Sequence, residues 1–232
     1  MRRPLYILRS SVAGYGAFED ERRVALDLIL IGHGAALVEV VDEAWVLAAK
    51  RGLGPHRVPF RIAGIELLTP NGDARPYKRT LADEWTLDEA VRTAGGANPS
   101  QPCTAGFPTP LRLHRDGEVI LRPDFPDLAL AAARRVREFL DDPLSKVLAS
   151  LDPDILEQAR TTPRSEWSGV SSGLRRYSAT QQKEFSMEGV TGVLLLPNGP
   201  GGLWPLLVAA EWLHIGKGTV FGMGRLVLGA AR

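Results

Sequence analysis

The chain has a single cysteine, Cys103, among its 232 residues. One thiol cannot form an internal disulfide, and by itself it cannot build a zinc site of the cysteine-rich kind. The four histidines show no metal-ligand spacing with this cysteine or with one another. The sequence therefore predicts no metal site and no cofactor.

Long apolar runs are also lacking. No window comes near the roughly 18 uninterrupted apolar residues that a membrane-spanning helix needs. The N-terminal residues MRRP lead into mixed sequence without the apolar stretch of a signal peptide. We therefore expect a cytoplasmic protein with no membrane partner.

A basic excess is missing as well. The 28 lysines and arginines are balanced by 27 aspartates and glutamates, which gives a formal net charge of +1. Because bulk attraction to polyanions requires a positive balance, any nucleic-acid surface must be local. Only five of the basic residues are lysines. Arginine suits bidentate phosphate contacts, although genomic base composition accounts equally well for this bias.

Glycine, by contrast, is concentrated near the C-terminus, in residues 214–225. Glycines permit positive φ angles and allow backbone N–H groups to face outward as an anion-binding nest. The loop holds Gly216, Gly218, Gly222 and Gly224. It lacks the GxxxxGK[ST] pattern of a mononucleotide site and leads into a strand rather than a helix.

Charged and aromatic side chains accompany these glycines. Lys217 and Arg225 add positive charge, His214 closes one end, and Phe221 offers a face on which a base can stack. This combination predicts contact with a nucleic-acid backbone by the four glycines and by Lys217, Phe221 and Arg225. The alternative is a purely structural glycine turn with Phe221 in the core.

The hydrophobic pattern divides the chain into two halves with related element orders. Residues 1–100 are predicted to contain strands at 5–9 and 24–31, a helix at 35–50 and a strand at 59–68. Residues 101–232 are predicted to contain a hairpin of 111–114 with 119–121 turning at Asp116-Gly117, a helix at 128–140, a helical insertion near 143–168, strands at 174–185 and 190–196 around a turn at 187–189, a helix from Pro205 and a strand at 226–228. The predicted fold class is α+β, with tandem ferredoxin-like (RRM-like) domains.

Three segments carry a resemblance to a known family. Residues 214–225 read HIGKGTVFGMGR, residues 107–117 read FPTPLRLHRDG and are followed by PDFPDL at 123–128, and residues 51–54 read RGLG. In this order they resemble the CRISPR-associated endoribonucleases of the RAMP superfamily, which process repeat RNA. The resemblance spans roughly residues 4–232.

This resemblance implies two ferredoxin-like units and metal-independent cleavage of CRISPR repeat RNA to mature crRNA, with retention of the product. It implies attack of a ribose 2′-OH on the adjacent phosphorus, leaving a 2′,3′-cyclic phosphate. The implied partners are repeat RNA, crRNA and other subunits of a CRISPR effector complex. Family members begin with a strand and helix ahead of the segment that matches residues 5–9, so the N-terminal half is expected to be shortened. A compact variant, a late assigned start and a lost nuclease function each account for that difference.

Proton transfer near neutral pH points to histidine. His33, between two glycines just before the predicted helix 35–50, is the first catalytic candidate, with packing of the helix start as the alternative. His214 is the second, with positioning of the glycine loop or contact with phosphate as its other roles. His56 and Arg57 lie in a basic loop that favours RNA contact.

A cluster of arginines in the predicted helix 128–140 is a further RNA-binding candidate, with a solvated helix face as the alternative. It consists of Arg134, Arg135 and Arg137. Two functions besides the endoribonuclease stay open from the sequence. One is a crRNA-binding RAMP subunit without cleavage, and the other is a ferredoxin-like protein-interaction or small-ligand module.

Overall fold

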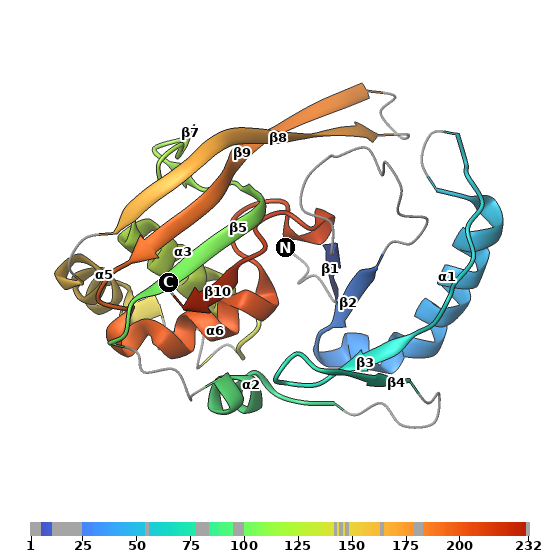
Figure 1. The fold of residues 1–232 in the computed structure, drawn as a ribbon, viewed down its shortest axis with the longest axis horizontal. Coiled ribbons are helices and arrows are strands. Elements are labelled where there is room, and N and C mark those ends of the chain that lie inside the picture. The colour runs from blue at the N-terminus through green and yellow to red at the C-terminus, as the bar shows by residue number, and fades with distance from the viewer. Residues whose placement is uncertain are drawn as a thin grey trace.

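The computed structural model describes residues 6–10, 25–53, 56–77, 84–94, 100–141, 143, 146, 149–162, 165–178 and 183–230 (Figure 1). A four-stranded antiparallel sheet with the strand order β10, β5, β9, β8 forms the centre of the C-terminal half. In chain order its elements are β5 (Cys103–Leu111), α3 (Phe125–Arg137), β8 (Glu166–Ser178), β9 (Lys183–Leu196), α6 (Trp204–Leu213) and β10 (Val227–Ala230). This βαββαβ order, with the first strand between the last and the third, is the ferredoxin-like arrangement that the sequence predicts.

The main hydrophobic core lies between this sheet and helices α3 and α6, which pack against each other. Ala105 and Phe107 of β5 are buried while the intervening Gly106 is partly exposed, as the period of two in a strand requires. Leu128 of α3 and Leu207 of α6 fill the other side, 1% and 0% exposed. In Figure 1 both helices lie on the same side of the sheet.

Helix α3 begins three residues earlier than predicted. Asp124 is the N-cap, and its side chain accepts a hydrogen bond from the backbone N–H of Asp127, whose own side chain accepts from the N–H of Asp124. This reciprocal capping box starts the helix at Phe125. Asp124 therefore marks the start of the helix, and the predicted range 128–140 was shifted towards the C-terminus.

The sequence does not predict strand β5, since the first strand that its pattern indicates in this half is 111–114. Pro108 and Pro110 lie in β5, and proline cannot donate to a sheet ladder. Pairing of β5 with β9 shifts register between Phe107 and Leu111, so the prolines lie where the ladder is interrupted. This irregularity allows a central strand to contain two prolines, although proline normally argues against a central strand.

The predicted turn at 187–189 is also wrong. Met187, Glu188 and Gly189 lie inside β9, paired with residues 172–174 of β8. A Cβ at Gly189 would lie 2.6 Å from the carbonyl oxygen of Leu111. Glycine is therefore needed here because a neighbouring strand approaches closely, and not because the chain turns.

Two smaller predictions in this half are confirmed. Asp116 and Gly117, with φ of 52° and 90°, form the turn between β6 (His114–Arg115) and β7 (Glu118–Val119). Helix α5 (Asp152–Thr161) lies within the predicted insertion and packs on α3, where an ion pair of 3.3 Å joins Arg137 to Asp152.

The N-terminal half contains, in the described residues, two separate two-stranded sheets. Strand β1 (Tyr6–Ser10) pairs with β2 (Leu26–Leu30), and β3 (Glu66–Leu68) pairs with β4 (Ala74–Pro76). The 3₁₀ helix η1 (Gly32–Leu37) leads into α1 (Val38–Arg51), and α2 (Leu87–Thr93) ends this half. The strands predicted at 5–9 and 24–31 are thus confirmed, except that residues 5 and 24 lie outside the described residues. The helix predicted at 35–50 is confirmed from residue 38 onwards, whereas only the end of the predicted strand 59–68 is a strand.

The two halves meet at β1 and at α6. Strand β1 packs against η4 (Thr219–Phe221), a single 3₁₀ turn within the glycine loop, and α2 packs against α6. The rings of Trp85 and Trp212 meet edge to face with centroids 4.5 Å apart. In Figure 1, β1 and β2 consequently lie between the C-terminal sheet and α1, and α1 forms the outer edge of the molecule.

Among the described helices, none has both the length and the apolar character that crossing a membrane would demand.

Candidate functional site

The glycine loop, residues 214–225, connects α6 to β10 and passes beside β1. Its four glycines all adopt positive φ, as the sequence predicts: 81° at Gly216, 82° at Gly218, 79° at Gly222 and 67° at Gly224. Two of them are also required by close approach. A Cβ at Gly224 would lie 1.8 Å from the carbonyl oxygen of Ile215, and one at Gly216 would lie 2.6 Å from that of Arg112.

Hydrogen bonds within the protein occupy many of the loop's backbone N–H groups. Ile215 donates to Gly224 at 2.9 Å, Lys217 to Arg112 at 3.0 Å and Gly224 to Pro110 at 3.0 Å. Within the loop, Phe221 and Met223 donate to Gly218, and Gly222 donates to Thr219; Arg225 donates to the hydroxyl of Thr109 at 2.9 Å. For these groups the expectation of an outward-facing nest is wrong, because the loop folds back on β5 and on itself.

His214 lies completely inside the protein, with 0% of its surface exposed. Its Nδ1 donates to the carbonyl oxygen of Met223 at 3.2 Å, and its Nε2 is buried without a partner. Its backbone has φ 55° and ψ 162°, a region that essentially only glycine occupies and that costs other residues about 1–3 kcal/mol. Burial, followed by the nearby charges of Arg9, Arg225 and Arg135, lowers the pKa of His214 to about 4.

The exposed part of the loop carries Lys217 and Phe221, the latter 42% exposed. Arg225 is partly buried, and burial together with the charge of Arg9 lowers its pKa. Two guanidinium groups and an ammonium group therefore gather around one short loop.

Arg9 is a site residue that sequence reasoning missed. Its Nε lies 2.6 Å from Oδ2 of Asp27, its register partner across β1 and β2, and its guanidinium carbon lies 5.0 Å from the centre of the Trp212 ring. The Arg9 side chain is only 13% exposed. A lone charge of opposite sign in each of two apolar strands was the available signal, but the pairing depends on strand register.

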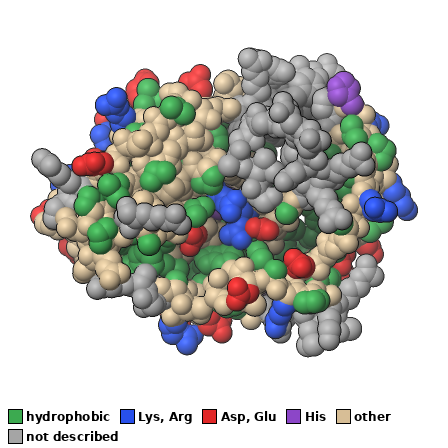
Figure 2. Space-filling model, in the orientation of Figure 1, with side chains coloured by type: hydrophobic (Ala, Val, Ile, Leu, Met, Phe, Trp, Pro, Cys, Tyr) green, Lys and Arg blue, Asp and Glu red, His purple; other side chains and the backbone are tan. Residues whose placement is uncertain are grey.

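Glu211 of α6 belongs to the same charged cluster as Arg9 and Arg225, which lies where the two halves meet at β1 and α6. Its Oε1 accepts a hydrogen bond from the backbone N–H of Leu228 at 2.9 Å, and burial raises its pKa despite the opposing charges of Arg9 and Arg225. Figure 2 shows basic and acidic side chains lying together near the middle of the displayed face. Elsewhere among the described residues of that face the charged side chains are scattered, which agrees with the near-zero net charge.

His33 lies in η1, directly after β2, and its side chain is exposed. Among the described residues, no hydrogen bond or ion pair joins it to residues 214–225. It therefore differs from His214 in the one property that proton exchange with a bound substrate requires, which is access to solvent.

His56 and Arg57 are exposed in the turn that follows α1. Leu53 and Val58 close this turn with two backbone hydrogen bonds of 2.9 Å, and Arg57 has a φ of 49°. A Cβ at Gly52 would lie 2.1 Å from the carbonyl oxygen of Arg57, so the turn is tightly packed at its base.

The three arginines of α3 do not share one exposed face. Arg134 is exposed, whereas Arg137 is bound to Asp152 of α5. Arg135 is 6% exposed, and its Nε donates to the carbonyl oxygen of Leu213 at 3.0 Å. The expectation of an arginine-rich RNA-binding face on this helix is therefore wrong for Arg135.

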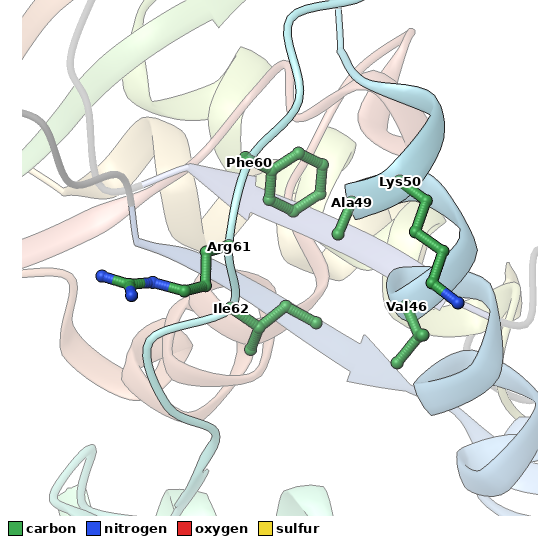
Figure 3. A pocket seen from close by; sticks show the side chains of 6 residues that line it. All are labelled: Val46, Ala49, Lys50, Phe60, Arg61 and Ile62. Atoms are coloured by element: carbon green, nitrogen blue, oxygen red, sulfur yellow. The ribbon is translucent and has the colours of Figure 1, made fainter.

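A shallow groove lies between α1 and residues 60–62, away from the glycine loop. Figure 3 shows Phe60 pointing towards Ala49 and Ile62 towards Val46, with the Arg61 side chain directed away from the groove. Trp45 packs edge to face on Phe60 at 6.3 Å between centroids. The groove is apolar and contains none of the predicted site residues.

No three His, Cys, Asp or Glu side chains gather as a metal site in the part of the chain that the structure describes.

A model of the CRISPR-associated endoribonuclease Cas6 family matches residues 106–226, more than half of the chain. The chain belongs to this family. It is an RNA-cleaving enzyme of CRISPR RNA processing, as the resemblance of its motifs implied. A second family model, that of an N-terminal domain, matches residues 2–92, and no curated protein sequence matches the chain.

Solved Cas6 structures share its fold. A product complex of Thermus thermophilus Cas6 (TTHB231) is 21% identical with a TM-score of 0.60, covering 98% of this chain and 83% of that one. A product complex of Cas6 (TTHA0078) is 18% identical with a TM-score of 0.55, covering 98% and 85%. Another Thermus thermophilus Cas6 (TTHB231) structure is 17% identical with a TM-score of 0.54, covering 98% and 80%.

The tight packing of the glycine loop leads to a prediction about stability. Gly224→Ala and Gly117→Ala both place a Cβ on a residue with positive φ, at a cost of about 1–3 kcal/mol. Only at Gly224 does the Cβ also meet a backbone oxygen, at 1.8 Å, while nothing lies within 4 Å of the one at Gly117. Gly224→Ala should therefore lower the melting temperature, followed by circular dichroism, far more than the control Gly117→Ala. Equal losses would show that the loop packs less tightly than described.

The depressed pKa of His214 makes the stability of this protein depend on pH. Unfolded His214 takes up a proton near its ordinary pKa of 6.5, whereas the folded residue stays neutral down to about 4. Between these values the unfolded state binds more protons, so stability falls as pH falls through this window, by up to about 3 kcal/mol from this residue. Urea titrations from pH 7 to pH 4 should show a smaller loss for His214→Asn than for the unmodified chain. A loss of the same size in both would contradict burial of a neutral imidazole.

Proposed function

We propose that this protein cleaves CRISPR repeat RNA once per repeat, without a metal ion, to produce mature crRNA. In this reaction the ribose 2′-oxygen forms a bond to the adjacent phosphorus while the bond from phosphorus to the 5′-oxygen breaks. A base accepts the proton of the 2′-OH and an acid protonates the leaving 5′-oxygen. The products carry a 2′,3′-cyclic phosphate and a free 5′-OH.

The observation that carries this proposal is the placement of the glycine loop at the joint between the halves. Packing at Gly224 and Gly216 fixes the loop, Lys217 is exposed on it, and Arg9 and Arg225 lie behind it. Fixed positive groups lower the energy of a phosphorane-like transition state most when they need not move during the reaction. RNA laid across this joint would meet such groups at its backbone.

For proton transfer we assign His33 as the general base or acid, because its side chain is exposed and histidine is the residue type suited to proton exchange near neutral pH. His214 is unsuited to this role, since its imidazole does not reach solvent. The other exposed candidates are assigned to RNA binding: Lys217, Phe221, His56, Arg57 and Arg134. Arg225 is added as a partly buried phosphate contact, and Gly216, Gly218, Gly222 and Gly224 define the loop's shape.

Product retention is part of the proposal. Two of the solved structures that share this fold are product complexes. We extend this property to the present chain and infer that it keeps the cleaved crRNA and presents it to other subunits of a CRISPR effector complex.

Mapping of product ends tests the proposed chemistry. Purified protein in EDTA should cut end-labelled repeat RNA at one site and leave a 2′,3′-cyclic phosphate. A single 2′-deoxy substitution 5′ of the cut should abolish cleavage, because it removes the nucleophile. Cleavage restored only by added metal would overturn the mechanism, and tight binding without cutting would identify a crRNA-holding subunit instead.

The assignment of His33 is tested by comparison with His56. His33→Ala should lower the single-turnover rate at saturating protein by roughly 10²–10⁴-fold, the usual worth of a general acid or base, with little change in RNA affinity. His56→Ala should raise the dissociation constant for RNA, measured by filter binding. An unchanged rate in His33→Ala would assign proton transfer to another group.

A further inference from the structure

One arginine of helix α3 binds the junction between α6 and the glycine loop. Nε of Arg135, on α3, donates to the carbonyl oxygen of Leu213, the last residue of α6, at 3.0 Å. The Arg135 guanidinium also pairs with Glu138 and lies 4.7 Å from the centre of the Phe139 ring. Because the side chain is 6% exposed and held at several points, it fixes the place where the helix ends.

His214, the next residue, closes the base of the loop from inside. Its Nδ1 donates to the carbonyl oxygen of Met223, and the adjacent backbone bond from Ile215 to Gly224 measures 2.9 Å. The entry and exit of the loop are thus joined side by side. The segment between them, which carries Lys217 and Phe221, has its position set by this closure.

The strained backbone of His214 indicates that its side chain explains why a histidine, and not a glycine, occupies this position. With φ 55° and ψ 162° it occupies a conformation suited to glycine, in a loop where four neighbouring positions are glycine. A glycine would adopt this conformation without strain but would leave the Met223 carbonyl without its imidazole donor. A strained residue held by its own side-chain bond points to a role for that bond.

We propose that Arg135 and His214 are positioning residues for RNA cleavage, which lock the glycine loop in the geometry that presents Lys217 to the RNA backbone. The inference rests on the proposed function. His214 acts as a hydrogen-bond donor of fixed tautomer, with the proton on Nδ1, and takes no part in proton transfer. Burial, followed by the charges of Arg9, Arg225 and Arg135, lowers the pKa of His214 to about 4, so its imidazole is neutral near pH 7.

An asparagine can replace a histidine in this role but not as an acid or base. In His214→Asn the side-chain amide of the introduced asparagine would donate from nearly the same place as Nδ1, and the strained backbone conformation is one that asparagine shares with histidine as a non-glycine residue. We therefore compare single-turnover cleavage of repeat RNA by His214→Asn, His214→Ala and Arg135→Ala from pH 5.5 to pH 8.5. The matched control for removal of an arginine is Arg160→Ala, an exposed position on α5.

We expect His214→Asn to keep most of the cleavage rate with an unchanged pH profile. His214→Ala and Arg135→Ala should lose on the order of 10- to 10²-fold, because a small displacement of positioning groups costs this much. Arg160→Ala should behave like the unmodified protein. A folded His214→Asn that is as inactive as His214→Ala, or that changes the pH profile, would overturn the proposal.

A measurement without RNA keeps the inference separate from the proposed function and from variants that fail to fold. In ¹⁵N-histidine spectra of the unmodified protein, His214 should carry its proton on Nδ1 and show no titration between pH 8 and pH 5. Titration near pH 6.5 would overturn the proposed positioning role of His214, whether or not the protein cuts RNA. If the spectra fit and repeat RNA is not cut, the proposed function fails while the closure of the loop stands.

Discussion

The approach of one backbone to another at the base of the glycine loop is the constraint on which the site depends. Gly224 lies against the carbonyl of Ile215, and Gly216 lies against that of Arg112, at distances that leave no room for a side chain. The loop is consequently packed like part of the core, and a hydrogen bond from Gly224 to Pro110 ties it to β5. The packing of the loop therefore fixes the backbone positions from which its cationic side chains extend.

The contact between the two halves, at β1 and α6, is where the proposed function places a local basic site in a nearly neutral protein. Arg9 is neutralised in part by Asp27 and packs over Trp212, while Arg225 lies near Glu211. Partial burial weakens solvent screening, so these few groups act more strongly here than they would on an open surface. Net charge alone therefore does not indicate where the proposed RNA contact lies.

Local patterns predicted the regular elements well where each one depends on its own residues. The Asp116-Gly117 turn, the start signal of α3 and the positive φ of the loop glycines follow from side-chain chemistry over a few positions. Strand β5 and the position of the β8–β9 hairpin were missed for one shared reason. Pro108, Pro110 and Gly189 suggest loops, but each serves an irregularity or a close approach to a strand that is distant in sequence.

The same distinction between local and long-range information applies to the candidate site. The sequence by itself determined which groups are available: a glycine-rich loop with Lys217 and Arg225, a family resemblance, and only four histidines. Tertiary structure alone decided that His214 and Arg135 face inward, that His33 faces outward and that Arg9 joins the loop. The physical reason is that a residue's type sets its chemistry, whereas burial and charged neighbours, which set its pKa and its access to RNA, come from segments brought together only by folding.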